Sequence, residues 1–284
     1  MSGQEAGLKK YGAQIIEDLS RQGLVWAGSG HPSTEITFNP HARHEDAIPF
    51  AIPEIDHILP HGGLQRGSIH EFFYNDPLQP RAFPTSLIST IARNAHELIT
   101  QQRSWNEAES TRGILWIGKR SWPTPYALVQ GTRDRESATM PLLQSALFID
   151  TSGDRMTLWA LETALRSPAV NLVVADCPRL SLTTTKRLLL AARENRTTAL
   201  LIRNSKDRAL PSCAATRWVI SPTPSPYDTP LWELSLITIR GHVLRSSSWL
   251  IGIHEHESSL SLRVFPRVAD RCHEEKAAIQ EYGT

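Results

Sequence analysis

The sequence predicts an α/β domain in which helices flank a mostly parallel sheet, with antiparallel strands added near the C-terminus. Strand and helix patterns alternate from Ser68 to Asn204, as is typical of parallel sheets. The short runs GILWIG (113–118) and AVNLVVADCP (169–178) are almost wholly apolar, like strands that are buried on both faces. After Arg208 the strand patterns instead alternate apolar and polar residues, which indicates antiparallel pairs.

The first part of the chain, residues 1–48, is predicted to hold one helix and a linker. The helix ends near Gly23, and its apolar residues share one face: Leu8, Tyr11, Ile15 and Leu19. This face could cover a groove of the same chain or contact a partner protein, and both alternatives stay open. The segment that follows is rich in turn-forming and polar residues, as linkers are.

The α/β domain is predicted over residues 49–266, followed by a charged tail at 267–284. It begins with a helical turn, a turn at Gly62–Gly63 and a strand from Ser68 to Phe73. The next helix has Pro84 in its first turn, where the missing N–H costs nothing. The later strands are GILWIG, ALFIDT, AVNLVVADCP, TTALLIRN, AATRWVISP, LWELSLITIRG, SSWLIGIH and SLSLRVFP, and the later helices are PYALVQG, RMTLWALETALRS and SLTTTKRLLLAAREN.

The composition predicts a cytoplasmic protein. No apolar run approaches the roughly 18 residues that indicate a membrane span, and the first residues lack the apolar core of a signal peptide. Cys177, Cys213 and Cys272 lie far apart, so neither a disulfide framework nor a zinc site is indicated. The net charge of +1 argues against a strong overall attraction to nucleic acid.

The loop after the first strand of the parallel sheet occupies the place of a phosphate-binding loop. Such a loop needs glycines, whose backbone N–H groups surround phosphates, and a lysine. Residues 74–84 contain neither, and Pro77 and Pro80 each remove a donor. We therefore predict a degenerate nucleotide loop that binds no ATP and no other cofactor, formed by Tyr74, Gln79, Pro80 and Arg81.

Asp176 ends an apolar strand, as the metal-binding acid of nucleotide hydrolases does. A residue that caps the next helix is an equally good alternative. Glu71 lies within a strand and is interpreted as a polar core residue, while Arg217 and Trp218 could pack on a strand or form a recognition face.

Other polar residues give weaker signals. His254 and His256 share a strand face without a third ligand, so no metal site is predicted. A triad of Ser86, His70 and Asp176 has no nucleophile-elbow pattern to support it.

Taken together, these segments resemble the RecA-like superfamily. IDHILPHGGLQRGSIHEFF (55–73) is similar to the segment that precedes the P-loop in bacterial recombinases. A closer resemblance is to the ImuA family, the RecA- and SulA-related proteins of mutagenesis cassettes. It spans about Ile52 to Arg240 and rests on the order of GILWIG, LWALETALRS, SLTTTKRLLLAAREN, AATRWVISPTPS and WELSLITIRG. It implies a RecA-like core whose P-loop is degenerate, with Tyr74 in place of the first loop glycine and Pro80 near the lysine.

The resemblance also implies a function and partners. Members of the family are non-catalytic accessory factors in SOS-induced translesion synthesis, and they act with an ImuB-like relative of Y-family polymerases and an error-prone replicative-type polymerase. RecA is a further expected partner, and we expect the protein to be nucleoid-associated when active. Recombinases use the loop after TTALLIRN for DNA, so weak DNA contacts are expected from Arg203, Lys206 and Arg208.

Two other functions remain as alternatives, a SulA-like inhibitor of cell division and a DNA-dependent RecA-like ATPase. Partner contacts are expected from the N-terminal helix face or from the edge formed by SSWLIGIH and SLRVFP.

Overall fold

The computed structural model describes residues 47–74, 82–101, 113–118, 122–123, 142, 146–225, 229–242, 247–256 and 259–265. Three predicted segments lie outside these residues: the N-terminal helix with Leu8, Tyr11, Ile15 and Leu19, the helix at 125–131 and the tail at 267–284. None of the helices in the described residues is long and apolar enough to cross a membrane.

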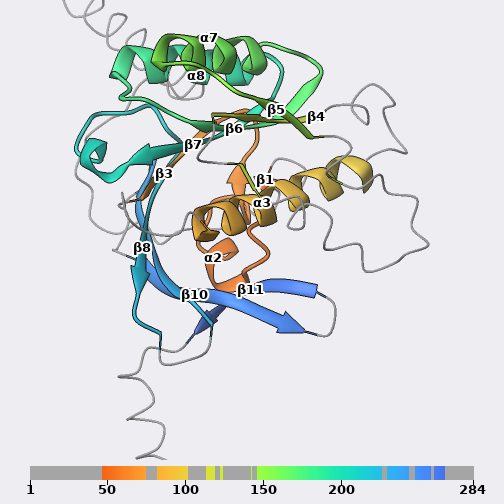
Figure 1. The fold of residues 1–284 in the computed structure, drawn as a ribbon, viewed down its shortest axis with the longest axis vertical. Coiled ribbons are helices and arrows are strands. Elements are labelled where there is room, and N and C mark those ends of the chain that lie inside the picture. The colour runs from red at the N-terminus through yellow and green to blue at the C-terminus, as the bar shows by residue number, and fades with distance from the viewer. Residues whose placement is uncertain are drawn as a thin grey trace, which may run out of the picture. The chain divides into compact units, whose positions relative to one another are not determined.

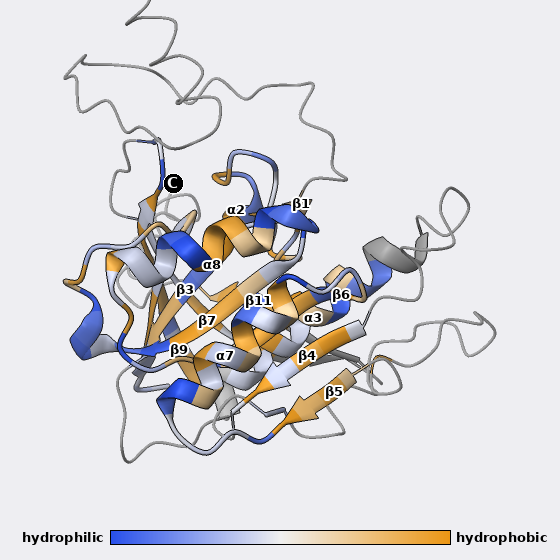
Figure 2. Ribbon diagram, turned by 90° about the horizontal axis from the view of Figure 1, so that it is seen from above, coloured by the Kyte–Doolittle hydropathy of each residue, from blue (hydrophilic) through white to orange (hydrophobic). Residues whose placement is uncertain are grey.

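Most of the described strands belong to one mixed sheet. Its nine strands follow the order β11-β10-β9-β8-β3-β7-β6-β4-β5 within the part of the chain that the structure describes. They are β3 (Ile69–Tyr74), β4 (Gly113–Ile117), β5 (Ala146–Ile149), β6 (Val170–Asp176), β7 (Thr198–Asn204), β8 (Thr216–Thr223), β9 (Leu231–Ile239), β10 (Ser247–His256) and β11 (Ser259–Phe265). Strands β5 and β7 are apolar along most of their length (Figure 2).

The strand directions confirm the predicted mixture, with one correction. All pairings from β8 through β3, β7, β6 and β4 to β5 are parallel, and those from β8 through β9 and β10 to β11 are antiparallel. Strand β8 is therefore parallel to β3, whereas the alternating pattern after Arg208 predicted antiparallel strands from this point. The reason is that residues 205–215 cross the sheet, so that β8 starts at the same end as β3.

Helices cover both faces of the sheet. Helix α3 (Ala82–Gln101) lies on one face, and helices α7 (Asp154–Leu165) and α8 (Leu182–Glu194) lie on the other (Figure 1). Alternate residues of β3 enter two separate cores: Phe72 packs in the cluster with the α3 residues, and Ile69 in the cluster with those of α7 and α8. This two-sided burial explains why the central strands are mostly apolar.

The ends of two helices follow the expected local chemistry. Pro84 lies in the first turn of α3, as predicted. Ser181 is the N-cap of α8, because its Oγ accepts a hydrogen bond from the Thr184 N–H at 3.1 Å. Asp176 does not form this cap, so that alternative for Asp176 was wrong.

A small element precedes the main sheet. Strands β1 (Ala47–Ile48) and β2 (Leu64–Gln65) pair in antiparallel fashion and enclose the helical turn α2 (Pro53–Asp56). Gly63 is required here, because a Cβ atom would lie 2.5 Å from the carbonyl oxygen of Ile48. The Asp56 carboxylate accepts a hydrogen bond from the Phe50 N–H at 2.8 Å and so fixes the chain before α2.

Candidate functional site

The carboxyl end of β3 marks where a phosphate loop would begin. Tyr74 is half-buried and is the last residue of β3, paired with Asn204 of β7 and Ile220 of β8. The loop thus starts one residue later than predicted, and Tyr74 belongs to the sheet. Gln79, Pro80 and Arg81 lie outside the described residues.

Asp176 lies at the carboxyl end of β6, and β7 separates it from β3. Its side chain is largely buried against the end of β4. Gly118 makes this approach possible: its φ is +87°, and a Cβ atom there would lie 2.7 Å from the Asp176 Cβ. The position agrees with the predicted place of the acid, at the same edge of the sheet as the end of β3.

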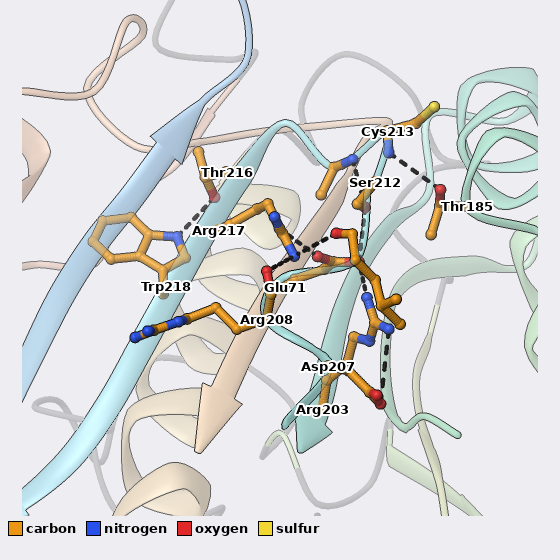
Figure 3. Close-up of polar contacts among 12 residues, drawn as sticks. Glu71, Thr185, Arg203, Asp207, Arg208, Ser212, Cys213, Thr216, Arg217 and Trp218 are labelled. Carbon is orange, nitrogen blue, oxygen red and sulfur yellow. Dashed lines mark hydrogen bonds and ion pairs between the residues drawn. The ribbon is translucent and has the colours of Figure 1, made fainter. Parts of the chain in front are cut away.

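Glu71 forms the centre of a buried ion cluster on the face of the sheet that carries α7 and α8 (Figure 3). Its Oε1 accepts hydrogen bonds from Arg203 Nη1 at 2.7 Å and from Ser212 Oγ at 2.8 Å. Its Oε2 accepts one from Arg217 Nε at 2.8 Å. The interpretation of Glu71 as a polar core residue is confirmed.

The ring of Phe73 supports both guanidinium groups of this cluster. The Arg203 and Arg217 Cζ atoms lie 5.3 Å and 4.9 Å from its centroid. At these distances the aromatic face attracts the cations as well as packing against them. One carboxylate and one ring therefore stabilise two arginines that come from different strands, β7 and β8.

Arg217 of this cluster, together with neighbouring side chains, forms hydrogen bonds with the backbone of the connection between β7 and β8. This crossover has only a single 3-10 turn, η3 (Ser205–Asp207), and no α-helix, so its backbone carbonyls need other donors. Arg217 Nη2 donates to the carbonyl oxygens of Arg208 at 2.9 Å and Leu210 at 3.1 Å. The Arg240 Nη1 group donates to Cys213 O at 3.0 Å, and Cys213 N donates to Thr185 Oγ1 at 3.1 Å. The charged side chains replace the contacts that a helix would provide.

The three predicted DNA contacts do not lie together. The Arg203 side chain is completely buried and paired with Glu71, so the prediction that Arg203 contacts DNA was wrong. Lys206 and Arg208 are exposed on the crossover. Asp207 lies between cations, with Oδ2 4.0 Å from Arg203 Nη2 and Oδ1 4.0 Å from Arg179 Nε.

His70 belongs to a different buried network on the opposite face of β3. Its Nε2 lies 2.9 Å from Gln65 O and its Nδ1 lies 2.8 Å from Thr216 Oγ1. A carbonyl only accepts, so Nε2 carries the proton and Nδ1 accepts from the Thr216 hydroxyl. That hydroxyl oxygen also accepts from Trp218 Nε1 at 2.7 Å. Both ring nitrogens of His70 are thus used within the fold, which agrees with the absence of sequence support for a triad of Ser86, His70 and Asp176.

The stability of the protein should depend on pH through His70. Burial lowers the pKa of His70 from 6.5 to about 4. Between pH 6.5 and pH 4 the His70 ring binds a proton in the unfolded chain but not in the folded protein. The free energy of unfolding is therefore highest above pH 6.5 and decreases as the pH falls towards 4. The loss should reach about 3 kcal/mol. The measurement is urea unfolding of the wild type and of His70→Gln at a series of pH values.

The difference in the free energy of unfolding between the wild type and His70→Gln reports on His70 without the contribution of Asp56. Burial raises the pKa of Asp56 to about 6, which by itself makes the folded state more stable as the pH falls from 6 to 4. This contribution is common to both proteins and cancels in the difference. If the difference in the free energy of unfolding between the wild type and His70→Gln stays constant from pH 7 to pH 4, the neutral state of buried His70 is contradicted.

Trp218 is buried and packs against Phe50 and Phe72. Of the two roles that the sequence left open for Trp218, packing is therefore confirmed and an exposed recognition face is excluded.

No group of three or more histidine, cysteine or acidic residues that could hold a metal occurs among the described residues. The side chains of His254 and His256 lie outside that part.

The Glu71 cluster was missed as a unit from the sequence. The sequence signal for this cluster is one charged residue in each of two strand runs that are mostly apolar, IHEFF and ALLIR. A buried acid and a buried base require each other.

Comparisons with known proteins bear on the fold alone. A scan against protein-family models and a search of curated proteins found no match. Among solved structures, the RadB recombinase is similar, with a TM-score of 0.54 and 11% sequence identity over 77% of this chain and 100% of the RadB chain. At this identity the likeness extends to the architecture only. The protein has a RecA-like fold, with a mostly parallel sheet, flanking helices and antiparallel strands at its C-terminal end.

Proposed function

We propose that this protein is a non-catalytic accessory factor in damage-induced translesion DNA synthesis. The observation that carries the proposal is a RecA-like sheet whose β3 strand is followed by a sequence without phosphate-loop chemistry. Residues 75–84 (NDPLQPRAFP) contain no glycine and no lysine but three prolines. Such a sequence cannot supply the run of backbone N–H donors that surrounds phosphates.

The geometry of the described acids supports the same proposal. Glu71 is completely buried and committed to Arg203, Arg217 and Ser212, so it is not available as a base or a metal ligand. Asp176 is the one acid at the end of β6, and Gly118 packs directly against its side chain. An acid in this place without a lysine loop has no triphosphate to act on.

The partners follow from the resemblance to the ImuA family. We propose that the protein contacts an ImuB-like relative of Y-family polymerases, an error-prone replicative-type polymerase and RecA, in the cytoplasm and at the nucleoid. A protein without catalysis must act through such contacts, and exposed apolar surface is where they form. The RecA-like fold supports this proposal in general terms, because the similar RadB structure is that of a recombinase.

The proposal predicts no ATP binding. Titration calorimetry of the purified protein with ATP and Mg²⁺ should give no heat of binding at millimolar nucleotide, and an active RecA-type recombinase serves as the positive control. Asp176→Asn should behave like the wild type. A micromolar dissociation constant that is lost in Arg81→Ala would show a working nucleotide site and contradict the proposal.

DNA binding should be weak and sensitive to salt. Lys206 and Arg208 are exposed on the β7–β8 crossover, and at a net charge of +1 they can provide only a local attraction. We expect affinities on the order of micromolar for single-stranded DNA at moderate salt, measured by fluorescence anisotropy. The double variant Lys206→Glu and Arg208→Glu should weaken binding and flatten its salt dependence.

The matched control for this experiment is Lys186→Glu, a charge reversal on the exposed face of α8. It should leave the DNA affinity close to that of the wild type. Nanomolar binding that persists at high salt, or equal losses in the crossover and α8 variants, would contradict this assignment.

A further inference from the structure

Arginines from distant parts of the sequence lie at the amino ends of the parallel strands. Five described segments meet at this edge of the sheet, because each precedes β3, β6, β7 or β8 or follows β9, which is antiparallel to β8: residues 66–68, 166–169, 193–197, 213–215 and 240–242. Together they contain five arginines and one acid, which gives a net charge of +4 in a chain whose total is +1. Positive charge is therefore concentrated at one edge of the sheet.

The fifth arginine, Arg166, is paired with Glu162 and with Glu194, which is the one acid of these segments. We call the other four the arginine edge: Arg66, Arg193, Arg196 and Arg240. Arg193 lies in the last turn of α8 and Arg196 just beyond it, where the negative end of the helix dipole stabilises cations. Arg196 has φ +57°, a conformation for which glycine or asparagine is usual after a helix. The chain thus has an arginine where the helix end favours another residue.

Contacts within the fold bring these arginines near one another. The Gly67 N–H donates to Thr198 Oγ1 at 3.3 Å, and a Cβ atom on Gly67 would lie 3.2 Å from the Arg196 Cα. The chain next to Arg66 therefore runs beside Arg196. Arg193 and Arg240 are neighbours as well: burial lowers the pKa of Arg240, and the positive charge of Arg193 lowers it further.

Arg240 is the member of the arginine edge that the fold explains least. Its side chain is half-buried, and Nη1 donates to Cys213 O at 3.0 Å, which uses one of its five N–H donors. In the part of the chain that the structure describes, Arg240 forms no ion pair with a carboxylate. Its neighbour is instead a second guanidinium group, and an anion bound beside both would offset their repulsion.

We propose that the arginine edge binds the phosphate backbone of DNA, with Arg193 and Arg240 as the principal contacts. The inference rests on the proposed function, which makes DNA the polyanion that the protein meets. Arg240 follows β9 and Arg196 precedes β7, so the edge extends over three strand spacings, or about 14 Å. This length exceeds what a single anion needs and fits consecutive phosphates of a polymer. Guanidinium groups suit such a ligand, because they donate pairs of hydrogen bonds to phosphate oxygens.

This contact is separate from the one expected at the β7–β8 crossover. Strand β7 runs from Thr198 at the arginine edge to Asn204, and Lys206 and Arg208 follow at its other end. A strand of this length spans about 20 Å. The losses of DNA affinity from variants at the two places should therefore be additive.

The test measures binding of the full chain to a fluorescent oligothymidylate by anisotropy, at a series of salt concentrations. The variants are Arg193→Gln combined with Arg240→Gln, and Arg196→Gln alone, which changes an exposed side chain. The matched control is Arg155→Gln, which removes the same charge from an exposed position in the first turn of α7. Thermal melting checks that each variant is folded. Unlabelled oligothymidylate, polyglutamate and inorganic phosphate serve as competitors.

We expect the double variant to bind DNA about 25-fold more weakly at about 0.1 M salt, because two lost phosphate contacts reduce the slope of log K against log salt concentration by about 1.4. Arg196→Gln should lose about 5-fold in affinity, and Arg155→Gln should bind like the wild type. If the double variant binds as well as the wild type, or if Arg155→Gln loses as much as Arg196→Gln, the inference is overturned while the proposed function stands. Polyglutamate or inorganic phosphate that competes as well as DNA at equal charge would assign the edge to acidic proteins or free anions, and would also overturn the inference.

The proposed function is tested separately, in a strain that lacks the gene. If the wild type binds DNA through the arginine edge but does not restore induced mutagenesis, the proposed function fails and the inference about the edge stands. If the wild type restores mutagenesis and the folded double variant does not, both are supported.

Discussion

Replacement of Glu71 by glutamine should lower the free energy of unfolding by about 3 to 5 kcal/mol. The substitution preserves the shape of the side chain but removes its charge. The buried Arg203 then loses its ion pair at 2.7 Å and keeps only the longer contact of its Nη2 with Asp207 Oδ2, at 4.0 Å. Arg217 loses the same carboxylate, and with it the geometry that directs its Nη2 to the crossover carbonyls. Urea unfolding followed by circular dichroism measures the change.

Glu162→Gln is the matched control for this prediction. Glu162 also contacts two arginines, Arg166 and Arg187, but on the surface of α7 and α8. Solvent screens such pairs, so its loss should cost about 1 kcal/mol or less. A third variant, Glu71→Leu with Arg203→Met, removes acid and base together and should be less destabilised than Glu71→Gln. Equal effects of Glu71→Gln and Glu162→Gln would show that the buried cluster contributes no more than a surface pair.

Trp218→Ala should destabilise the protein by about 3 to 5 kcal/mol, because it removes a large side chain from the centre of a core. The ring is completely buried, and its centroid lies 4.9 Å from that of Phe50 and 6.2 Å from that of Phe72. It also donates to Thr216, which connects the aromatic core to the His70 network.

Trp159→Ala provides the comparison, since it removes the same side chain from an exposed position on α7. Its effect on the free energy of unfolding should stay within about 0.5 kcal/mol. The two tryptophans thus separate a residue that stabilises the fold from one that is available for contacts. A small loss in Trp218→Ala, or a large one in Trp159→Ala, would contradict this division.

The sequence was sufficient to predict the layers of the fold because its periodicity follows from burial. The apolar runs around Ile114 and Val173 became strands covered on both faces. Ser181, the first residue of the run SLTTTKRLLLAAREN, is of a type that favours helix caps, and it is the N-cap of α8. The direction of β8 was not predicted. An alternation of apolar and polar residues indicates that one face of a strand is buried, but it does not indicate whether the strand runs parallel or antiparallel to its neighbour. That direction was decided by the crossover at residues 205–215.

The buried cluster was harder to predict for a different reason. Glu71 and Arg203 are far apart in the chain, and they meet only because β3 and β7 are neighbours in the sheet. Strand order is a tertiary property, so Arg203 looked like a loop arginine available to DNA. The same limitation applies to Asp176, whose contact with Gly118 depends on β4 and β6 lying side by side.

The central claim, that this protein supports damage-induced mutagenesis without nucleotide chemistry, is tested most directly by complementation. The measurement is the ultraviolet-induced mutation frequency in a host strain that lacks the gene and carries either the wild type or the double variant Arg81→Ala and Asp176→Asn. We predict that deletion reduces the induced frequency to the uninduced level, and that both proteins restore it equally. An induced frequency that survives deletion, or a folded double variant that fails to restore it, would contradict the claim.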